Sequence, residues 1–82
     1  MGTIVASMDN MDLATAKAVR TAIREADLTE PAVASAVGIP PSAWRRRMSG
    51  ARSFRVPELL KIARVIGART GDLVDGVMEK LA

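Results

Sequence analysis

Proline and glycine are spaced along the middle of the chain so that each helix there must be short. Proline is tolerated in the first turn of a helix, and glycine readily adopts the left-handed conformation that ends one. The prolines that fit a first turn are Pro31, Pro41 and Pro57, and the glycines that fit a helix end are Gly38, Gly50 and Gly67. These positions predict three short helices joined by tight connections.

Apolar residues recur at helical spacing, which indicates helices with one buried face. The apolar row of the first helix includes Leu13 and Val19, and the row after Pro57 includes Leu60 and Ile62. We predict an all-α fold of five short helices, over residues 12–26, 30–37, 41–49, 56–66 and from Thr70 onward, with Thr29 and Thr70 as N-caps. Residues 11–82 form the domain and residues 1–10 an arm, in which "TIVA" fits a short strand and a frayed tail equally.

The composition of the 82 residues excludes several classes of protein. Cysteine and histidine are absent, which removes disulfides, thiolate metal sites and the usual general base. We therefore expect no enzyme, no cofactor and no metal. No apolar run approaches the length of a membrane helix, and the first residues do not resemble a signal peptide. A cytoplasmic protein of a bacterium or a phage-infected cell is expected, without a membrane partner or a small-molecule ligand.

Positive charge is concentrated in the stretch "PPSAWRRRMSGARSFR", residues 40–55. It holds five arginines, no carboxylate and the only tryptophan and phenylalanine of the chain. The other residues carry seven Lys and Arg against nine Asp and Glu. Such a distribution is typical of a surface that binds a polyanion, although a solvated basic helix face would give the same run.

The helix over residues 41–49 is predicted to have two different faces. Trp44 and Met48 are four residues apart and share the side of Ile39, so we expect both to pack in the core, as we do for Phe54. The residues that point mostly the other way are Ser42, Arg45, Arg46 and Ser49.

The stretch "LTEPAVASAVGIPPSAWRRRMSG", followed by "ARSFRVPELLKIARVIGARTGDLV", resembles the lambda-repressor and Cro family of helix-turn-helix proteins, also called the xenobiotic-response-element family. The resemblance covers about residues 17–75. The family's small helix contact, turn glycine, hydrophobic anchor, base-facing residue and helix stop fall at Ala34, Gly38, Ile39, Ser42 and Gly50. It implies a lambda-repressor-like DNA-binding domain whose recognition helix, residues 41–49, lies in the major groove.

The resemblance also implies roles for individual residues. Arginine can bridge guanine O6 and N7 in the major groove, and it can neutralise phosphate. We expect bases to be read by Ser42, Arg45 and Arg46. We expect the DNA backbone to be contacted by Thr29, Arg47, Ser49, Arg52 and Arg55. The structural core of the motif is expected at Ala34, Gly38, Ile39, Trp44 and Met48.

Four positions depart from the family pattern. Pro40 and Arg55 replace the usual Ser or Thr caps of their helices, and Pro41 replaces a Gln or Arg that reads bases in many members. Arg47 takes a position that is often apolar, and we expect it to lie at the helix flank and reach outward. Because of these departures, the resemblance does not give an operator sequence.

The function implied is a Cro-like or repressor-like phage regulator that binds double-stranded DNA at an operator as a homodimer and blocks transcription. In the last helix we expect Leu73 and Val77 to face the core. The apolar residues left for a dimer partner are Val74, Met78 and Leu81, with "TIVA" as the alternative dimer element. Two other functions stay open: a protein-interaction module on the same fold, such as an antitoxin or a phage factor that binds a host protein, and an excisionase-like architectural protein that bends DNA.

Overall fold

The computed structural model describes the backbone of residues 3–81 and the side chains of residues 11–69 and 71–81, and the regular secondary structure of this part of the chain is all helical. The predicted all-α fold with five helices is confirmed. The helices are α1 (Thr3–Glu25), α2 (Glu30–Val37), α3 (Pro41–Met48), α4 (Val56–Ile66) and α5 (Thr70–Leu81).

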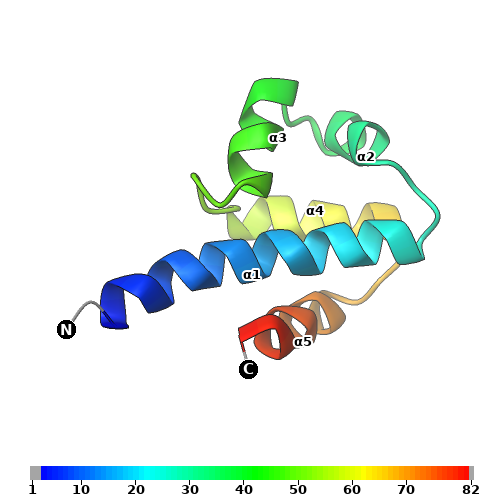
Figure 1. The fold of residues 1–82 in the computed structure, drawn as a ribbon. Coiled ribbons are helices and arrows are strands. Elements are labelled where there is room, and N and C mark those ends of the chain that lie inside the picture. The colour runs from blue at the N-terminus through cyan, green and yellow to red at the C-terminus, as the bar shows by residue number, and fades with distance from the viewer. Residues whose placement is uncertain (1–2, 82) are drawn as a thin grey trace.

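The long helix α1 runs through the middle of the molecule and separates two groups of helices (Figure 1). α2 and α3 lie on one side of it and α5 lies on the other. α4 packs against both α2 and α5, so it joins the two groups. α1 and α4 therefore form the scaffold from which α3 and α5 face away from each other.

The core contains apolar side chains from all five helices. Val19, Val33 and Ile62 are its most deeply buried large side chains, and they come from α1, α2 and α4. No polar or charged residue among the described side chains is fully buried. Hydrophobic burial is therefore the main source of stability, as expected for a chain without disulfides.

The ends of α2 are the ones that the sequence predicts. The Thr29 hydroxyl accepts a hydrogen bond from the Ala32 N–H at 3.3 Å, which satisfies one of the free donors of the first turn. Gly38 has φ 76°, in the left-handed region, and its N–H closes the last turn of α2. Gly38, Ile39 and Pro40 together form the three-residue connection to Pro41, the first residue of α3.

The turn after α3 favours a glycine because of its backbone conformation. Gly50 has φ 82°, which side chains rarely tolerate. A Cβ atom added there would lie 2.8 Å from Leu13 Cδ2 of α1, but that exposed terminal methyl group can turn away, so the backbone conformation is the main requirement. Leu13, predicted to lie in the apolar row of the first helix, is partly exposed beside this turn.

Several boundaries and contacts differ from the sequence prediction. α1 begins at Thr3, so "TIVA" continues the helix rather than forming a strand or a tail. Thr70 is the first residue of α5 and not its cap. The residue before the helix is Arg69, whose backbone N–H donates to Asp72 Oδ2 at 3.3 Å. Leu60, predicted to be a core contact, lies on the exposed side of α4.

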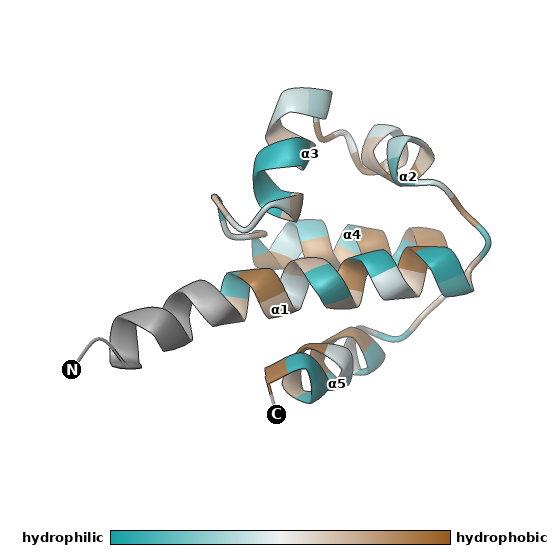
Figure 2. Cartoon of the chain, in the orientation of Figure 1, coloured by the Kyte–Doolittle hydropathy of each residue, from teal (hydrophilic) through white to brown (hydrophobic). Residues whose placement is uncertain are grey.

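α5 buries one side and leaves an apolar side uncovered. Leu73 is buried and Val77 half-buried, as predicted, and Gly76 lets α5 approach α1 closely, since a Cβ there would lie 3.4 Å from Ala18 Cβ. The apolar residues on the exposed side are Val74, Met78 and Leu81. Figure 2 shows the hydrophobic C-terminal end of α5 and the hydrophilic turns of α3. None of the described helices combines the length and hydropathy needed to cross a bilayer.

Candidate nucleic-acid interface

α3 has the two faces that its sequence predicts. Trp44 and Met48 are buried against the other helices. The residues on the opposite, exposed side are Ser42, Arg45, Arg46 and Ser49. Apart from the exposed Pro41 at its start, the helix therefore presents polar and cationic side chains outward and packs its apolar side inward.

Trp44 is the main anchor of α3, and it is held by more than apolar burial. Its ring meets Phe54 edge to face, with the centroids 5.7 Å apart and the planes at 78°. Its indole N–H donates to Glu30 Oε1 of α2 at 3.0 Å. The predicted core position of Trp44 is confirmed, and Phe54 is half-buried beside it. The role of Glu30 was not predicted, because its partner lies 14 residues away on another helix.

The remaining predicted core residues of this region also lie where expected. Ala34 and Ile39 are buried, and Gly38 forms the left-handed end of α2. The N–H of Ile39 donates to the carbonyl of Ala34 at 2.9 Å, which fixes the path of the chain between α2 and α3.

Arg47 does not reach outward, so this prediction is wrong. Its guanidinium donates from Nε to Glu58 Oε1 of α4 at 2.9 Å and from Nη1 to the Ala43 carbonyl at 3.2 Å. The side chains of Arg47 and Glu58 are only 15% and 17% exposed. Because Glu58 offers a partly buried carboxylate beside the last turn of α3, Arg47 joins α3 to α4 instead of facing solvent.

Glu58 is shared between two partners at the start of α4. The backbone N–H of Arg55 donates to the same Oε1 atom at 2.8 Å. Partial burial alone would raise the pKa of Glu58, but this N–H and the Arg47 guanidinium outweigh it and hold the pKa below its ordinary value. Arg55 itself has no side-chain acceptor to complete a capping box, and its guanidinium is exposed.

The turn between α3 and α4 is closed by the carbonyl of Arg46 and braced by α1. That carbonyl accepts the N–H groups of Ala51 and Arg52 at 3.0 and 3.2 Å. Ser53 Oγ donates to Asp12 Oδ1 of α1 at 2.7 Å. The exposed Arg52 side chain therefore projects from a backbone that is fixed at both ends.

Ser49 and Thr29, which are predicted to contact the DNA backbone, have hydroxyl groups that already form hydrogen bonds within the protein. Ser49 Oγ donates to the Arg46 carbonyl at 3.0 Å, and Thr29 Oγ1 accepts the cap bond of α2. Both residues are exposed. Thr29 still has its own hydroxyl proton to donate, whereas Ser49 must give up its internal bond to donate elsewhere.

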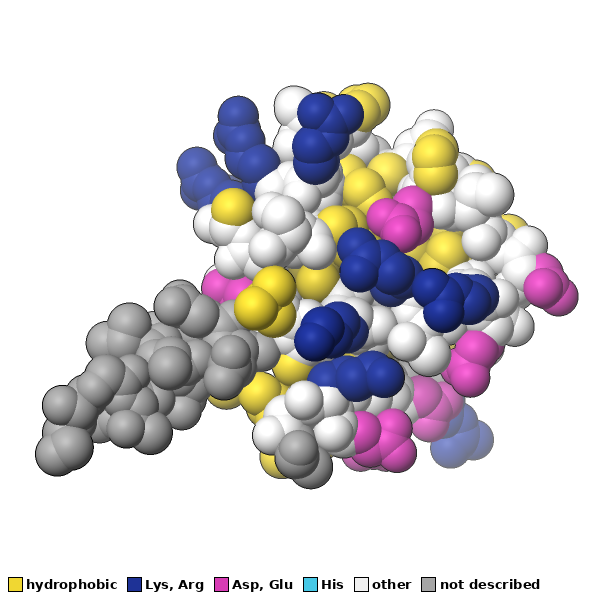
Figure 3. Space-filling model, viewed as in Figure 1, with side chains coloured by type: hydrophobic (Ala, Val, Ile, Leu, Met, Phe, Trp, Pro, Cys, Tyr) yellow, Lys and Arg dark blue, Asp and Glu magenta, His cyan; other side chains and the backbone are white. Residues whose placement is uncertain are grey.

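The exposed arginines have no ionic partner among the described side chains. Among the arginines of the described part of the chain, only Arg20 and Arg47 form ion pairs. Arg20 pairs with Glu30, and Arg47 pairs with Glu58. The exposed arginines of α3 and the following loop are Arg45, Arg46, Arg52 and Arg55. Figure 3 shows dark blue side chains gathered over α3 at the top of the molecule, and a second group across α1. These four predicted residues are therefore exposed on α3 and on the loop after it, and Arg47 is not among them.

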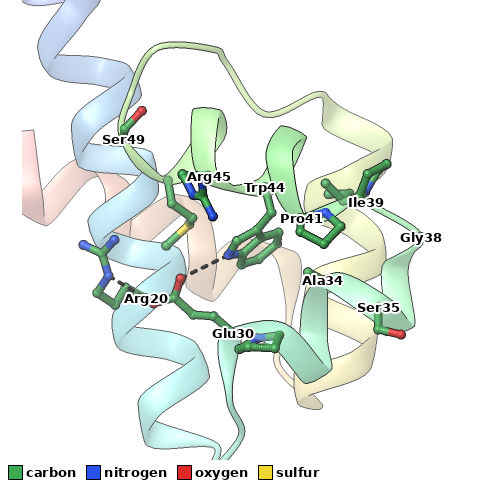
Figure 4. Close-up of a pocket in the computed structure, with 13 residues that line it drawn as sticks. Arg20, Glu30, Ala34, Ser35, Gly38, Ile39, Pro41, Trp44, Arg45 and Ser49 are labelled. Atoms are coloured by element: carbon green, nitrogen blue, oxygen red, sulfur yellow. Dashed lines mark hydrogen bonds and ion pairs between the residues drawn. The ribbon is translucent and has the colours of Figure 1, made fainter.

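An open groove lies between α1, α2 and α3 (Figure 4). Its floor is apolar and includes Ala34, Trp44 and Met48. Its charged lining residues are Arg20, Glu30 and Arg45, one from each of the three helices. The groove therefore continues the exposed side of α3 toward α1.

Comparisons with protein-family models, curated proteins and solved structures gave no significant match for this chain. The case for a function therefore depends on the geometry of α3 and its surroundings.

Proposed function

We propose that the protein is a sequence-specific, DNA-binding transcriptional regulator of the helix-turn-helix type, with α3 as its recognition helix. The observation that supports this most is the combination of two properties in α3. Its inner face is fixed by Trp44 and Met48, and its outer face carries Arg45 and Arg46, which have no ionic partner among the described residues. A rigid helix with free guanidinium groups suits the major groove of DNA.

The connection between α2 and α3 supports the same proposal. A capped helix, a three-residue turn that begins with a left-handed glycine, and a second helix with a polar outer side are the parts of this motif. In such motifs, residues near the start of the second helix meet base edges. Ser42, Arg45 and Arg46 are the residues proposed to read bases.

The backbone of the DNA would be contacted by residues around α3. Arg52 and Arg55 are exposed on the loop that follows it, Ser49 is exposed at its end, and Thr29 is exposed at the start of α2. Contacts of this kind position the protein without reading sequence. Arg47 is left out of the proposed interface, because Glu58 holds it against α4.

Two protein copies are proposed to bind one operator. A helix as short as α3 offers few base contacts, and a second copy doubles them. The exposed apolar side of α5, formed by Val74, Met78 and Leu81, is the proposed contact between the copies. A dimer bound across a promoter would block transcription in the manner of a small phage repressor.

Selection of binding sites from a random duplex library, followed by titrations at several salt concentrations, tests this proposal. We expect a two-fold symmetric consensus, and affinity for it that exceeds non-specific affinity by about 10³ or more. Binding without sequence preference but with bending of the duplex would favour an architectural protein. Absence of salt-dependent binding to any duplex would contradict the proposal and favour a protein-interaction module.

A further inference from the structure

The groove beside α3 contains a carboxylate, which is unexpected next to a surface proposed to bind DNA. Arg45 and Ser49 belong to the proposed interface and also line this groove. A duplex that contacts these two residues would therefore also lie over the groove, close to Glu30. Phosphates are repelled by a carboxylate at this position, so its presence calls for a physical explanation.

Glu30 joins three helices through its two oxygen atoms (Figure 4). Oε2 accepts from Arg20 Nε of α1 at 3.3 Å. Oε1 accepts from Trp44 Nε1 of α3 at 3.0 Å. Glu30 itself is the first residue of α2, where a negative charge is favoured by the helix dipole.

The two contacts of Glu30, with Arg20 and with Trp44, differ in how easily each can be broken. The side chains of Arg20 and Glu30 are 42% and 34% exposed, and ion pairs this accessible to water contribute little to stability. Trp44 is buried, so its N–H would be left without a partner if Glu30 moved away. Arg20 can therefore be released to another anion while the bond to Trp44 persists.

We propose that Glu30 limits the affinity of the protein for DNA of any sequence, an inference that rests on the proposed function. It neutralises Arg20 and repels phosphates at the groove, which lowers the affinity for every duplex alike. Non-specific binding depends almost entirely on such charge, whereas specific binding also draws on base contacts. This charge acts in both kinds of complex, so it lowers the two affinities by about the same factor, while the bond of Glu30 to Trp44 keeps α3 in position.

The test is a set of DNA titrations with Glu30→Gln, which keeps an oxygen for the indole N–H and removes the charge. We expect affinity for a non-specific duplex to rise several-fold, with the salt slope steeper by about one, because Arg20 becomes a free cation. Affinity for a specific duplex should rise by about the same factor, because the charge term is common to both complexes. Glu79→Gln is the matched control, since it removes an exposed carboxylate on α5, on the far side of α1, and should leave both quantities near wild type.

A double-mutant cycle shows whether Glu30 acts through Arg20. Arg20→Gln should weaken non-specific binding, and Glu30→Gln should raise it less in that background than in the wild type. The emission of Trp44, the only tryptophan of the chain, reports the bond to Glu30 without DNA. It should be unchanged in Glu30→Gln and shifted in Glu30→Ala.

Three outcomes would overturn the inference. The first is wild-type affinity and salt slope for a non-specific duplex in Glu30→Gln. The second is an equal gain in Glu79→Gln, which would show an effect of net charge alone. The third is a wild-type protein that binds no duplex, which removes the proposed function and this inference with it. In the first two cases wild-type binding to DNA persists, so the proposed function stands.

Discussion

α3 and α5 are two short helices that both bury one face against α1, yet they present opposite chemistry to the outside. α3 exposes Pro41, Ser42, Arg45 and Arg46 and no carboxylate. α5 exposes a group of large apolar side chains, Val74, Met78 and Leu81. The buried faces explain how the domain folds, whereas the difference between the exposed faces is the basis for proposing DNA as the partner of α3 and a second copy as the partner of α5.

The two helices are also attached to the scaffold in different ways. α3 is fixed by directional bonds, from Trp44 to Glu30 and from Arg47 to Glu58, which determine its position and rotation. α5 is attached to α1 by Leu73 and by the close approach at Gly76. A helix that must place arginines against base edges needs the first kind of attachment, because small displacements spoil hydrogen-bond geometry.

The largest effect is expected when the anchor of α3 is removed. Trp44→Ala should destabilise the fold by about 3–5 kcal/mol, since it opens a core cavity and leaves Glu30 without its indole partner. The matched change on α5, Val74→Ala, should stay within about 0.5 kcal/mol, because Val74 is exposed. Urea unfolding measures both. A Trp44→Ala variant that unfolds like the wild type but fails to bind DNA would show that Trp44 is a contact residue instead.

Charges on the exposed side of α5 should separate the two copies on the operator. Met78→Glu combined with Leu81→Glu places like charges opposite each other at the proposed contact, which should cost about 3 kcal/mol of association free energy. The fold should be nearly unaffected, since both side chains are exposed. Sedimentation with a full operator duplex should then show one copy instead of two. A dimer that survives the double substitution would place the contact elsewhere.

Neighbouring arginines of α3 should give opposite results. Arg46→Ala should weaken specific binding by about 1–3 kcal/mol and relax the preference at one base pair, with stability unchanged. Arg47→Ala should instead lower stability, because it leaves the carboxylate of Glu58 without its guanidinium partner. Binding-site selection and urea unfolding on both variants distinguish these effects. Full sequence discrimination in Arg46→Ala would remove that residue from base reading.

A smaller effect is expected from acid, which acts on the attachment of α3 to α4. The pKa of Glu58 is lower in the folded state than in the unfolded chain, so its contribution is present above the unfolded value, about 4.3 for an ordinary glutamate. It should be lost as the pH falls through the folded value, at a cost of about 1 kcal/mol. Glu58→Gln should be less stable at neutral pH and lose less stability than the wild type on acidification. Parallel pH profiles for the two proteins would contradict this.

The sequence predicted the parts of the fold that depend on local chemistry. Thr29, Gly38 and Gly67 act through backbone groups within a few residues, so their positions define helix ends directly. The two faces of α3 followed from helical spacing in the same way. The exposed apolar side of α5 was also predicted, because its apolar residues cover more of the helix than one core contact needs.

What the sequence did not reveal depends on contacts between helices. Arg47 was expected in the DNA interface, since nothing near it in the chain indicates that Glu58 lies beside it, 11 residues later. Glu30 was missed for the same reason. The start of α1 was left open, since the β-branched residues Thr3, Ile4 and Val5 favour a strand locally while the structure continues them as a helix.

The absence of a side chain at Gly76 has a consequence for how substitutions in the protein and half-site spacing in its operators could change together. α5 lies so close to α1 here that an added methyl group would just touch Ala18, and a larger side chain would push the helix outward. If α5 joins the two copies, residue 76 sets the angle between them and thus the separation of their recognition helices. Substitutions at a position far from any base could in this way retune the spacing of half-sites along the duplex, while the sequence read by each half stays the same.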